Sequence, residues 1–213
     1  MSANRILSIY KARTTILEQL EKFKYDVSDY NTFSINEVDA MFKNSQLDLL
    51  LTNIDDTSKK VYIKYYFTLK SGNKQIRTAT LDTIIEDLYE IENILTTRDT
   101  LVIIIDDEPN ETIINRVKYL FENQGIFIVI HNIKRLQFNI LEHSLMPDNV
   151  EIIKDDELNT LKEALNIKKI TDMPEISRFD PLALAIMLRP GQVMKCMRKS
   201  ITALRTPYYR ICV

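Results

Sequence analysis

Glycine, histidine, cysteine and tryptophan are all scarce in this chain of 213 residues. It has three glycines, two histidines, two cysteines and no tryptophan. The glycines, Gly72, Gly125 and Gly191, are isolated from one another, so neither a G-x-G-x-x-G nor a G-x-x-x-x-G-K loop exists to hold a phosphate. The sequence thereby excludes the usual nucleotide-binding loops.

The few histidines and cysteines form no pattern of metal ligands or nucleophiles. His131 and His143 stand alone, and Cys196 and Cys212 lack the C-x-x-C spacing of a structural zinc site. Two late cysteines do not make the disulfide framework of a secreted domain, and we interpret them as small apolar core residues. The sequence therefore predicts no catalytic residue, no bound metal and no cofactor.

Long apolar runs are missing as well. The strongly apolar run Leu101 to Ile105 is far shorter than the roughly 20 residues that a membrane-spanning helix needs. The N-terminus shows no apolar stretch or cleavage pattern of a signal peptide. We therefore expect a soluble intracellular protein without a membrane partner.

An acidic cluster, Asp106-Asp107-Glu108, directly follows this run. It lies at the carboxyl end of a predicted strand, where α/β proteins often place ligand sites and where a nuclease could hold a metal. Restriction-type nuclease folds generally need an acidic residue two positions before a lysine, and the chain has no D-x-K or E-x-K. We interpret the cluster as an acidic loop, with a divergent nuclease as an alternative.

Charge is distributed unevenly along the chain. From Ser177 to the end there are seven basic residues and one acidic residue, which gives +6. The total of −2 then leaves −8 for residues 1–176. A basic end suits either nucleic acid or an acidic protein surface, and charge alone does not choose between them.

Residues 1–140 alternate between helical and strand patterns. Short apolar, β-branched runs are typical of buried strands, and Gly125 follows a helical pattern where a left-handed residue is expected. This alternation predicts a mixed α/β domain with at least one parallel pair of strands. The expected elements are helices at 6–23, 34–51, 81–95 and 111–123, strands at 61–67, 101–105 and 126–130, and a turn at 71–73.

Residues 141–213 have a different character and predict a small second α/β domain. Asp180 can cap a helix that Pro181 begins, and Pro190-Gly191 ends it. The fold class expected for the whole chain is α/β, of the α+β kind. The expected elements of this part are helices at 155–165 and 182–188 and strands at 193–198 and 208–213.

Several short motifs of this second domain occur in a characteristic order. They are Glu142 to Val150, Asp180-Pro181, Arg189 to Val193, Arg198-Lys199-Ser200, Thr202-Ala203 and Tyr208 to Ile211. In this order they resemble the fifth subunit shared by the eukaryotic nuclear RNA polymerases, together with its shorter archaeal counterpart.

The N-terminal part is similar to the eukaryotic version of that family. Arg5 to Val27 resembles the family's first helix, and the strand Leu101 to Ile105 with its acidic loop fits the end of the family's jaw domain. The archaeal proteins lack the jaw, which has a restriction-endonuclease-like topology. The resemblance thus implies a nuclear polymerase, or the virion and host cytoplasm if the chain belongs to a large DNA virus.

The resemblance implies a non-catalytic subunit of a DNA-directed RNA polymerase. Its C-terminal module docks on the largest subunit beside other polymerase subunits, and its jaw lies along the cleft for downstream duplex DNA. A stand-alone regulatory module derived from such a subunit is an alternative. The residues expected to contact the partner are His143, Pro147, Arg189, Gly191, Arg198, Lys199, Ser200, Tyr209 and Arg210.

The chain departs from the family pattern at two places. The family commonly has Gly after the Thr-Ala pair, and Leu204 stands there, so we expect a differently built turn because Leu tolerates a positive φ poorly. The family's neutral loop near DNA corresponds to Glu108-Pro109-Asn110-Glu111. Pro109 and Asn110 are the candidate DNA-contacting residues, and the flanking carboxylates disfavour phosphate.

Overall fold

The computed structural model describes residues 3–67 and 76–213, and the chain divides into two compact units, Met1–Asn139 and Ile140–Val213. Both units combine helices with a four-stranded sheet, which confirms the predicted α+β class. The predicted turn at 71–73 lies outside the described residues. No helix in the described ranges is long and apolar enough to cross a membrane.

The sheet of the N-terminal unit has the strand order β1-β2-β3-β4. β2 pairs with β3 and β3 with β4, both in parallel, whereas β1 runs antiparallel to β2. The predicted parallel pairing is therefore confirmed. The strands are β1 (Leu49–Thr52), β2 (Lys60–Tyr66), β3 (Thr100–Ile105) and β4 (Phe127–Asn132).

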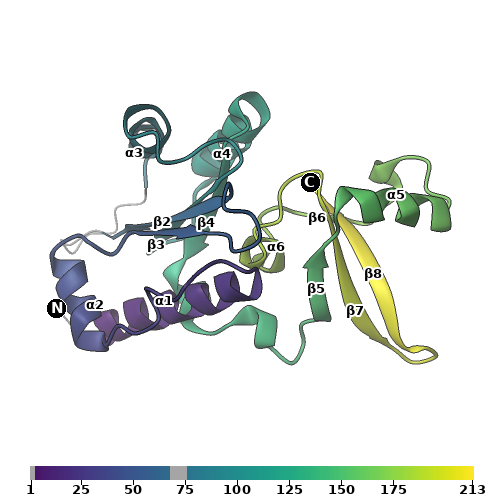
Figure 1. Ribbon diagram of the computed structural model, residues 1–213, viewed down its shortest axis with the longest axis horizontal. Coiled ribbons are helices and arrows are strands. Elements are labelled where there is room, and N and C mark those ends of the chain that lie inside the picture. The colour runs from purple at the N-terminus through teal and green to yellow at the C-terminus, as the bar shows by residue number, and fades with distance from the viewer. Residues whose placement is uncertain (1–2, 68–75) are drawn as a thin grey trace. The chain divides into compact units, whose positions relative to one another are not determined.

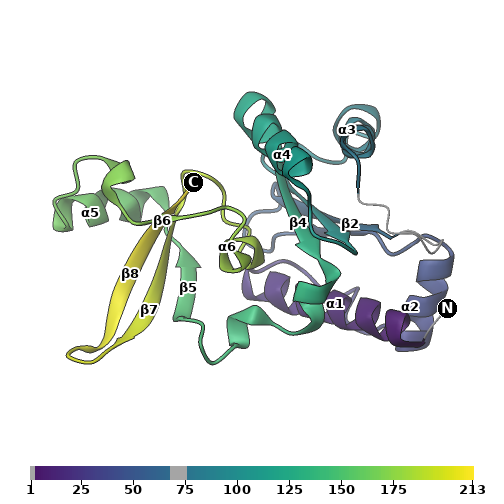
Figure 2. The ribbon, with the colours of Figure 1, turned by 180° about the vertical axis from the view of Figure 1, so that it is seen from behind.

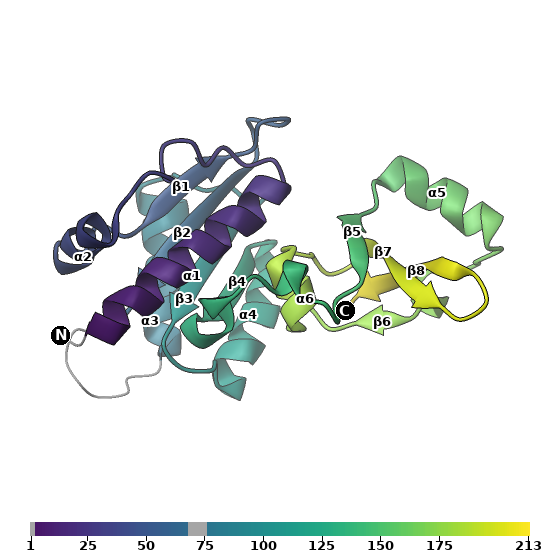
Figure 3. The same ribbon diagram turned by 90° about the horizontal axis from the view of Figure 1, so that it is seen from below.

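Helices cover both faces of this sheet. α1 lies across one face, and α3 and α4 lie on the other (Figures 1 and 3). Every residue of β3 is buried, which is why Leu101 to Ile105 are continuously apolar rather than alternating. The helical segments are α1 (Ala3–Lys22), α2 (Ile35–Lys43), α3 (Thr78–Ile85), the π-helical turn Glu86–Ile91, α4 (Glu111–Gln124) and the 3₁₀ helix Ile133–Gln137.

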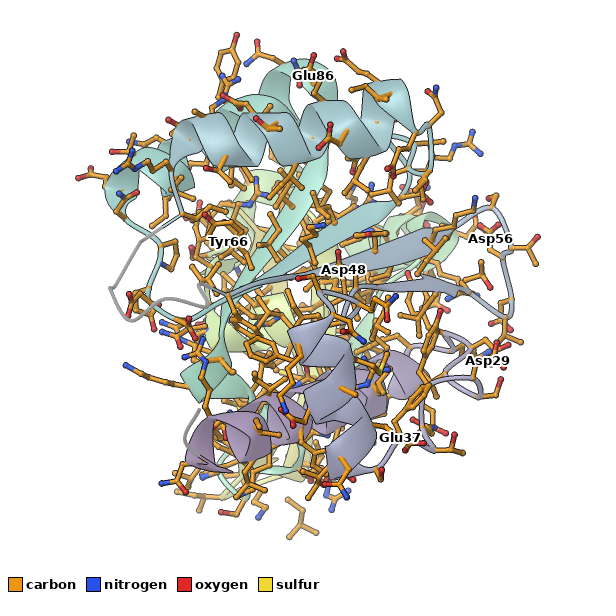
Figure 4. All side chains as sticks on the ribbon, turned by 90° about the vertical axis from the view of Figure 1, so that its left-hand side faces the viewer. Asp29, Glu37, Asp48, Asp56, Tyr66 and Glu86 are labelled. Carbon is orange, nitrogen blue, oxygen red and sulfur yellow. The ribbon has the colours of Figure 1, made fainter. Side chains whose placement is uncertain are left out.

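The predicted helix over residues 34–51 is wrong in its second half. Ser34 and Glu37 form a capping box that starts α2, but the helix ends at Lys43. Asp48 then accepts hydrogen bonds from the Tyr65 backbone N–H at 3.0 Å and from Lys64 Nζ at 2.6 Å, beside the sheet (Figure 4). These contacts with β2 place the residues after Asp48 in a strand, β1. They join residues that are distant in sequence, so the local hydrophobic pattern does not predict them.

His131 lies in β4 and is only 5% exposed. Burial, with a smaller effect of the nearby Arg135 charge, lowers the pKa of His131 from 6.5 to about 4. Between these values the unfolded chain binds a proton that the folded chain excludes, so stability falls as pH falls from about 6.5 to 4, by at most about 1.4 kcal/mol per pH unit.

Urea titrations at several pH values test this dependence. His131→Gln should flatten the decline of unfolding free energy in this window, whereas the exposed His143→Gln should retain it. Equal slopes in all three proteins would show that the acid sensitivity comes from other groups.

The C-terminal unit has a second sheet, in the order β5-β7-β8-β6. β7 pairs antiparallel with β5 and β8, and β6 pairs parallel with β8 (Figure 2). The strands are β5 (Asp148–Ile152), β6 (Glu175–Ile176), β7 (Val193–Ser200) and β8 (Leu204–Cys212). The helical segments are α5 (Asp155–Ala164), α6 (Pro181–Ala185) and the 3₁₀ turns Ile140–Glu142 and Ile170–Asp172.

The predicted start of α6 is confirmed, since Asp180 accepts a hydrogen bond from the Leu182 N–H and Pro181 occupies the first turn. The helix stops at Ala185, before the predicted end at Leu188. β7 and β8 extend further than predicted, because pairing between the two strands continues to Ser200 and Leu204, through residues that are mostly exposed. Because this arm of the hairpin is mostly exposed, its sequence has no apolar pattern from which strands could be predicted.

Candidate assembly surface

The two faces of the β7–β8 hairpin carry different chemistry. Side chains alternate along each strand, and directly paired residues share a face. We define the arginine face as Met194, Cys196, Arg198, Ser200, Leu204, Thr206, Tyr208 and Arg210. The lysine face comprises Val193, Lys195, Met197, Lys199, Arg205, Pro207, Tyr209 and Ile211.

Two cations of the lysine face are paired within the unit. Lys195 Nζ lies 2.8 Å from Glu151 Oε1, and Arg205 Nη2 lies 3.5 Å from Asp148 Oδ2. Both carboxylates belong to β5, the neighbouring strand. The hydrogen bond and charge of Glu151 raise the pKa of Lys195. Part of this face is therefore neutralised by its own sheet.

The inner end of the lysine face is structural. Tyr209 packs against an apolar cluster that includes Ile153, Val193 and Ile211. α5 supplies Leu158 and Leu161 to the same cluster. Tyr209 is one of the residues predicted to contact the partner, and the structure shows that its side chain helps to hold α5 on the sheet.

The cations of the arginine face stack on an aromatic ring instead. The guanidinium carbon of Arg198 lies 4.0 Å from the centroid of the Tyr208 ring, and that of Arg210 lies 5.3 Å from it. Among the described residues, neither arginine takes part in an ion pair. Two positive charges thus meet at one ring, and in the described part of the chain neither has a carboxylate within ion-pair distance.

Cys196 lies at the inner end of the arginine face and is buried. Burial raises the pKa of its thiol, while the positive charges of Arg198 and Arg210 act in the opposite direction. Cys212 is also buried, and burial raises the pKa of its thiol to about 11. Both cysteines are free thiols, in agreement with their interpretation as core residues.

Other residues predicted to contact the partner lie in loops. Gly191 has φ +87 and donates its N–H to the Cys212 carbonyl, so it forms the turn that precedes β7. The Arg189 N–H donates to Gln192 Oε1 across the same turn. His143 accepts a hydrogen bond from the Leu145 N–H, and Pro147 directly precedes β5. The structure thus brings together Arg198, Ser200 and Arg210, whereas Lys199 and Tyr209 lie on the opposite face.

Tyr208 was not among the residues predicted to contact the partner, which included its neighbour Tyr209. The sequence nevertheless contains a signal for Tyr208. Alternation along a strand places Tyr208 on the same face as Arg210, two residues away, and Tyr209 on the other.

The turn of the hairpin contains a leucine with a positive φ. Leu204 takes φ +59, the left-handed conformation that Leu tolerates poorly, and a turn built differently from the family's stays a prediction. The Ala203 N–H donates to Ser200 Oγ across the turn. A side chain larger than glycine therefore occupies a left-handed position, at a cost of roughly 1–2 kcal/mol.

The acidic loop of the N-terminal unit is held by arginines. Arg5 Nη2 lies 2.8 Å from Asp106 Oδ2, and Arg135 Nη2 lies 3.1 Å from Glu108 Oε2. Asn110 accepts a hydrogen bond from the Ile113 N–H and so caps α4. In the described part of the chain, no three His, Cys, Asp or Glu side chains are grouped to hold a metal ion.

Comparisons with known proteins agree with the order of motifs. The family RNA polymerase Rpb5, C-terminal domain, matches residues 138–212. The archaeal DNA-directed RNA polymerase subunit Rpo5 of Methanococcoides burtonii is 38% identical over 77 residues, which are 36% of this chain and 96% of that protein. In Dictyostelium discoideum, the subunit rpabc1 of DNA-directed RNA polymerases I, II and III is 25% identical over 210 residues, 99% of this chain and 98% of that protein.

Both relatives are subunits of DNA-directed RNA polymerases. The class of protein to which the chain is similar is therefore that of transcription proteins. The chain belongs to the Rpb5 family, whose archaeal members are named Rpo5. The resemblance found in the sequence is therefore confirmed. The match to the Dictyostelium protein extends over both units, whereas the archaeal match spans about a third of the chain.

Proposed function

We propose that the chain is a non-catalytic subunit of a multisubunit DNA-directed RNA polymerase, and that the arginine face of β7–β8 docks on the largest subunit. The observation that carries the proposal is the pair of arginines around Tyr208, Arg198 and Arg210, which have no ion-pair partner among the described residues. Guanidinium groups form charge-assisted, bidentate hydrogen bonds with carboxylates, so this face suits an acidic protein surface.

The two faces of the hairpin differ in how readily they can bind the carboxylates of such a partner. Lys195 and Arg205 already have carboxylate partners on β5, so binding a new one would first break an existing ion pair. Arg198 and Arg210 have no such pair among the described residues. Stacking on Tyr208 already orders their side chains, so they lose less conformational entropy on binding. The arginine face is therefore the favoured docking side.

The N-terminal unit is proposed to be the jaw that lies along the cleft for downstream DNA. Pro109 and Asn110 are its candidate DNA-contacting residues. Arg5 and Arg135 offset the charges of Asp106 and Glu108, which reduces the repulsion between this loop and phosphates. The same ion pairs oppose a nuclease, because they engage carboxylates that a catalytic metal would need.

The compartment follows from the polymerase. It is the nucleus for a cellular enzyme of the eukaryotic kind, and the virion and host cytoplasm for a viral one. The full-length similarity to the Dictyostelium protein supports the nuclear assignment.

A tagged pull-down from the native source, followed by mass spectrometry, tests the proposed function. We expect the two large polymerase subunits to elute in near-equal amounts with the chain, and the isolated chain to show no nucleotidyl transfer. Absence of the large subunits would leave the alternative of a stand-alone module derived from a polymerase subunit.

A further inference from the structure

The tip of the β7–β8 hairpin exposes two large apolar side chains. Ile201 is fully exposed, and Leu204 is 83% exposed. Leu204 is thus energetically unfavourable in two ways: its large apolar side chain is exposed to water, and its backbone is left-handed at φ +59. Glycine would remove both costs, and the family commonly has glycine after the Thr-Ala pair.

Leu204 is continuous with the charged part of the arginine face. It pairs with Ser200, and the next pair on this face, one step closer to the core, is Arg198 with Thr206. An apolar group at the end of a row of cations has the composition of a binding surface, in which a buried apolar anchor is surrounded by polar contacts.

We infer that Leu204, with Ile201 beside it, is an apolar anchor that enters a pocket on the polymerase subunit contacted by the arginine face. The inference rests on the proposed function and specifies its partner further. The pocket is apolar at its base and carries carboxylates on the side that meets Arg198. The strain at Leu204 persists because burial of the side chain in the complex offsets it.

This assignment predicts opposite effects of one substitution on stability and on assembly. In the full chain, Leu204→Gly should raise the midpoint of thermal unfolding of the C-terminal unit by about 4 °C, because the left-handed position no longer strains the backbone. The same variant should enter the polymerase about tenfold less well than wild type, because the anchor is lost.

The assembly measurement is a competition. Differently tagged wild-type and variant chains are expressed together in the native source, and their ratio in the purified polymerase is determined by mass spectrometry. Leu204→Met keeps an apolar side chain and the strain, so it should retain the wild-type ratio. Ile201→Ser removes the second apolar group without changing Leu204, and it should lower incorporation.

The possible results separate the two proposals. A Leu204→Gly chain that is stabilised and incorporated as well as wild type would overturn the anchor and leave the proposed function intact. A Leu204→Gly chain that is not stabilised would overturn the strain on which the inference depends. If wild type itself is missing from the polymerase, the proposed function fails and the anchor fails with it.

Discussion

Arg198→Glu is expected to release the chain from the polymerase, whereas Lys199→Glu is expected to leave it bound. The two residues are adjacent in sequence and both are exposed, yet they lie on opposite faces of β7. Arg198 belongs to the face whose cations are unpaired in the described structure. A glutamate there would repel the carboxylates that we propose for the partner.

The expected loss is large because the proposed contact is charge-assisted. Removing one partner of a close ion pair at an interface costs about 2–5 kcal/mol, which corresponds to at least roughly a thirtyfold loss of affinity. Arg198→Lys keeps the charge but loses the planar guanidinium that stacks on Tyr208. It should therefore bind more weakly than wild type but better than Arg198→Glu.

Co-purification of each tagged variant with the largest polymerase subunit measures this effect. The matched variant Lys199→Glu makes the same charge change one position away. Circular dichroism of each purified chain shows whether the fold is retained. Equal recovery of Arg198→Glu and wild type would contradict docking through the arginine face, and selective loss of Lys199→Glu would move the docking surface to the lysine face.

Asp99→Ala is expected to destabilise the N-terminal unit by about 2–4 kcal/mol. Asp99 is only 1% exposed and directly precedes β3. Its carboxylate accepts hydrogen bonds from the Lys60 N–H at 2.6 Å, the Thr96 N–H at 2.7 Å and the Thr96 hydroxyl at 2.8 Å. Alanine would leave these donors without their acceptor at the point where β2 and β3 begin.

Urea unfolding, followed by circular dichroism, gives the change in free energy. Asp99→Asn should lose less than Asp99→Ala, because its amide oxygen can still accept one of these hydrogen bonds. Asp56 also accepts from a nearby backbone N–H and hydroxyl, both of Ser58, but this group is exposed, so Asp56→Ala should change little. An Asp99→Ala protein as stable as the Asp56→Ala protein would show that water replaces the lost acceptor.

Much of the N-terminal fold could be predicted because its signals are local. The apolar run at β3 and the glycine after α4 define elements through backbone preference and burial. Gly125 takes φ +71 and donates its N–H to the Phe121 carbonyl, as its position predicted. β1 could not be predicted in this way. Its strand conformation depends on pairing with β2 and on the hydrogen bond that Asp48 accepts from the backbone of β2.

The candidate surface was predicted less completely. The order of motifs in residues 141–213 indicated the family and the basic end of the chain. It did not show which basic residues act together, because that depends on register: a shift of one residue along a strand exchanges the two faces. The observed register separates Arg198 from Lys199 and joins Arg198 to Arg210 through Tyr208.

Residue types alone were enough to predict the family, the α+β class, the boundaries of most buried strands and the absence of a nucleotide-binding glycine loop. These features follow from short-range patterns of residue type, which the chain carries whatever its tertiary contacts. The folded structure was needed to show that β5 neutralises Lys195 and Arg205, and that Leu204 has a left-handed backbone at an exposed tip. Ion pairs between strands form only where strand pairing brings distant residues together. The strain in the turn depends on the register of the two strands that it joins, and both are fixed only on folding.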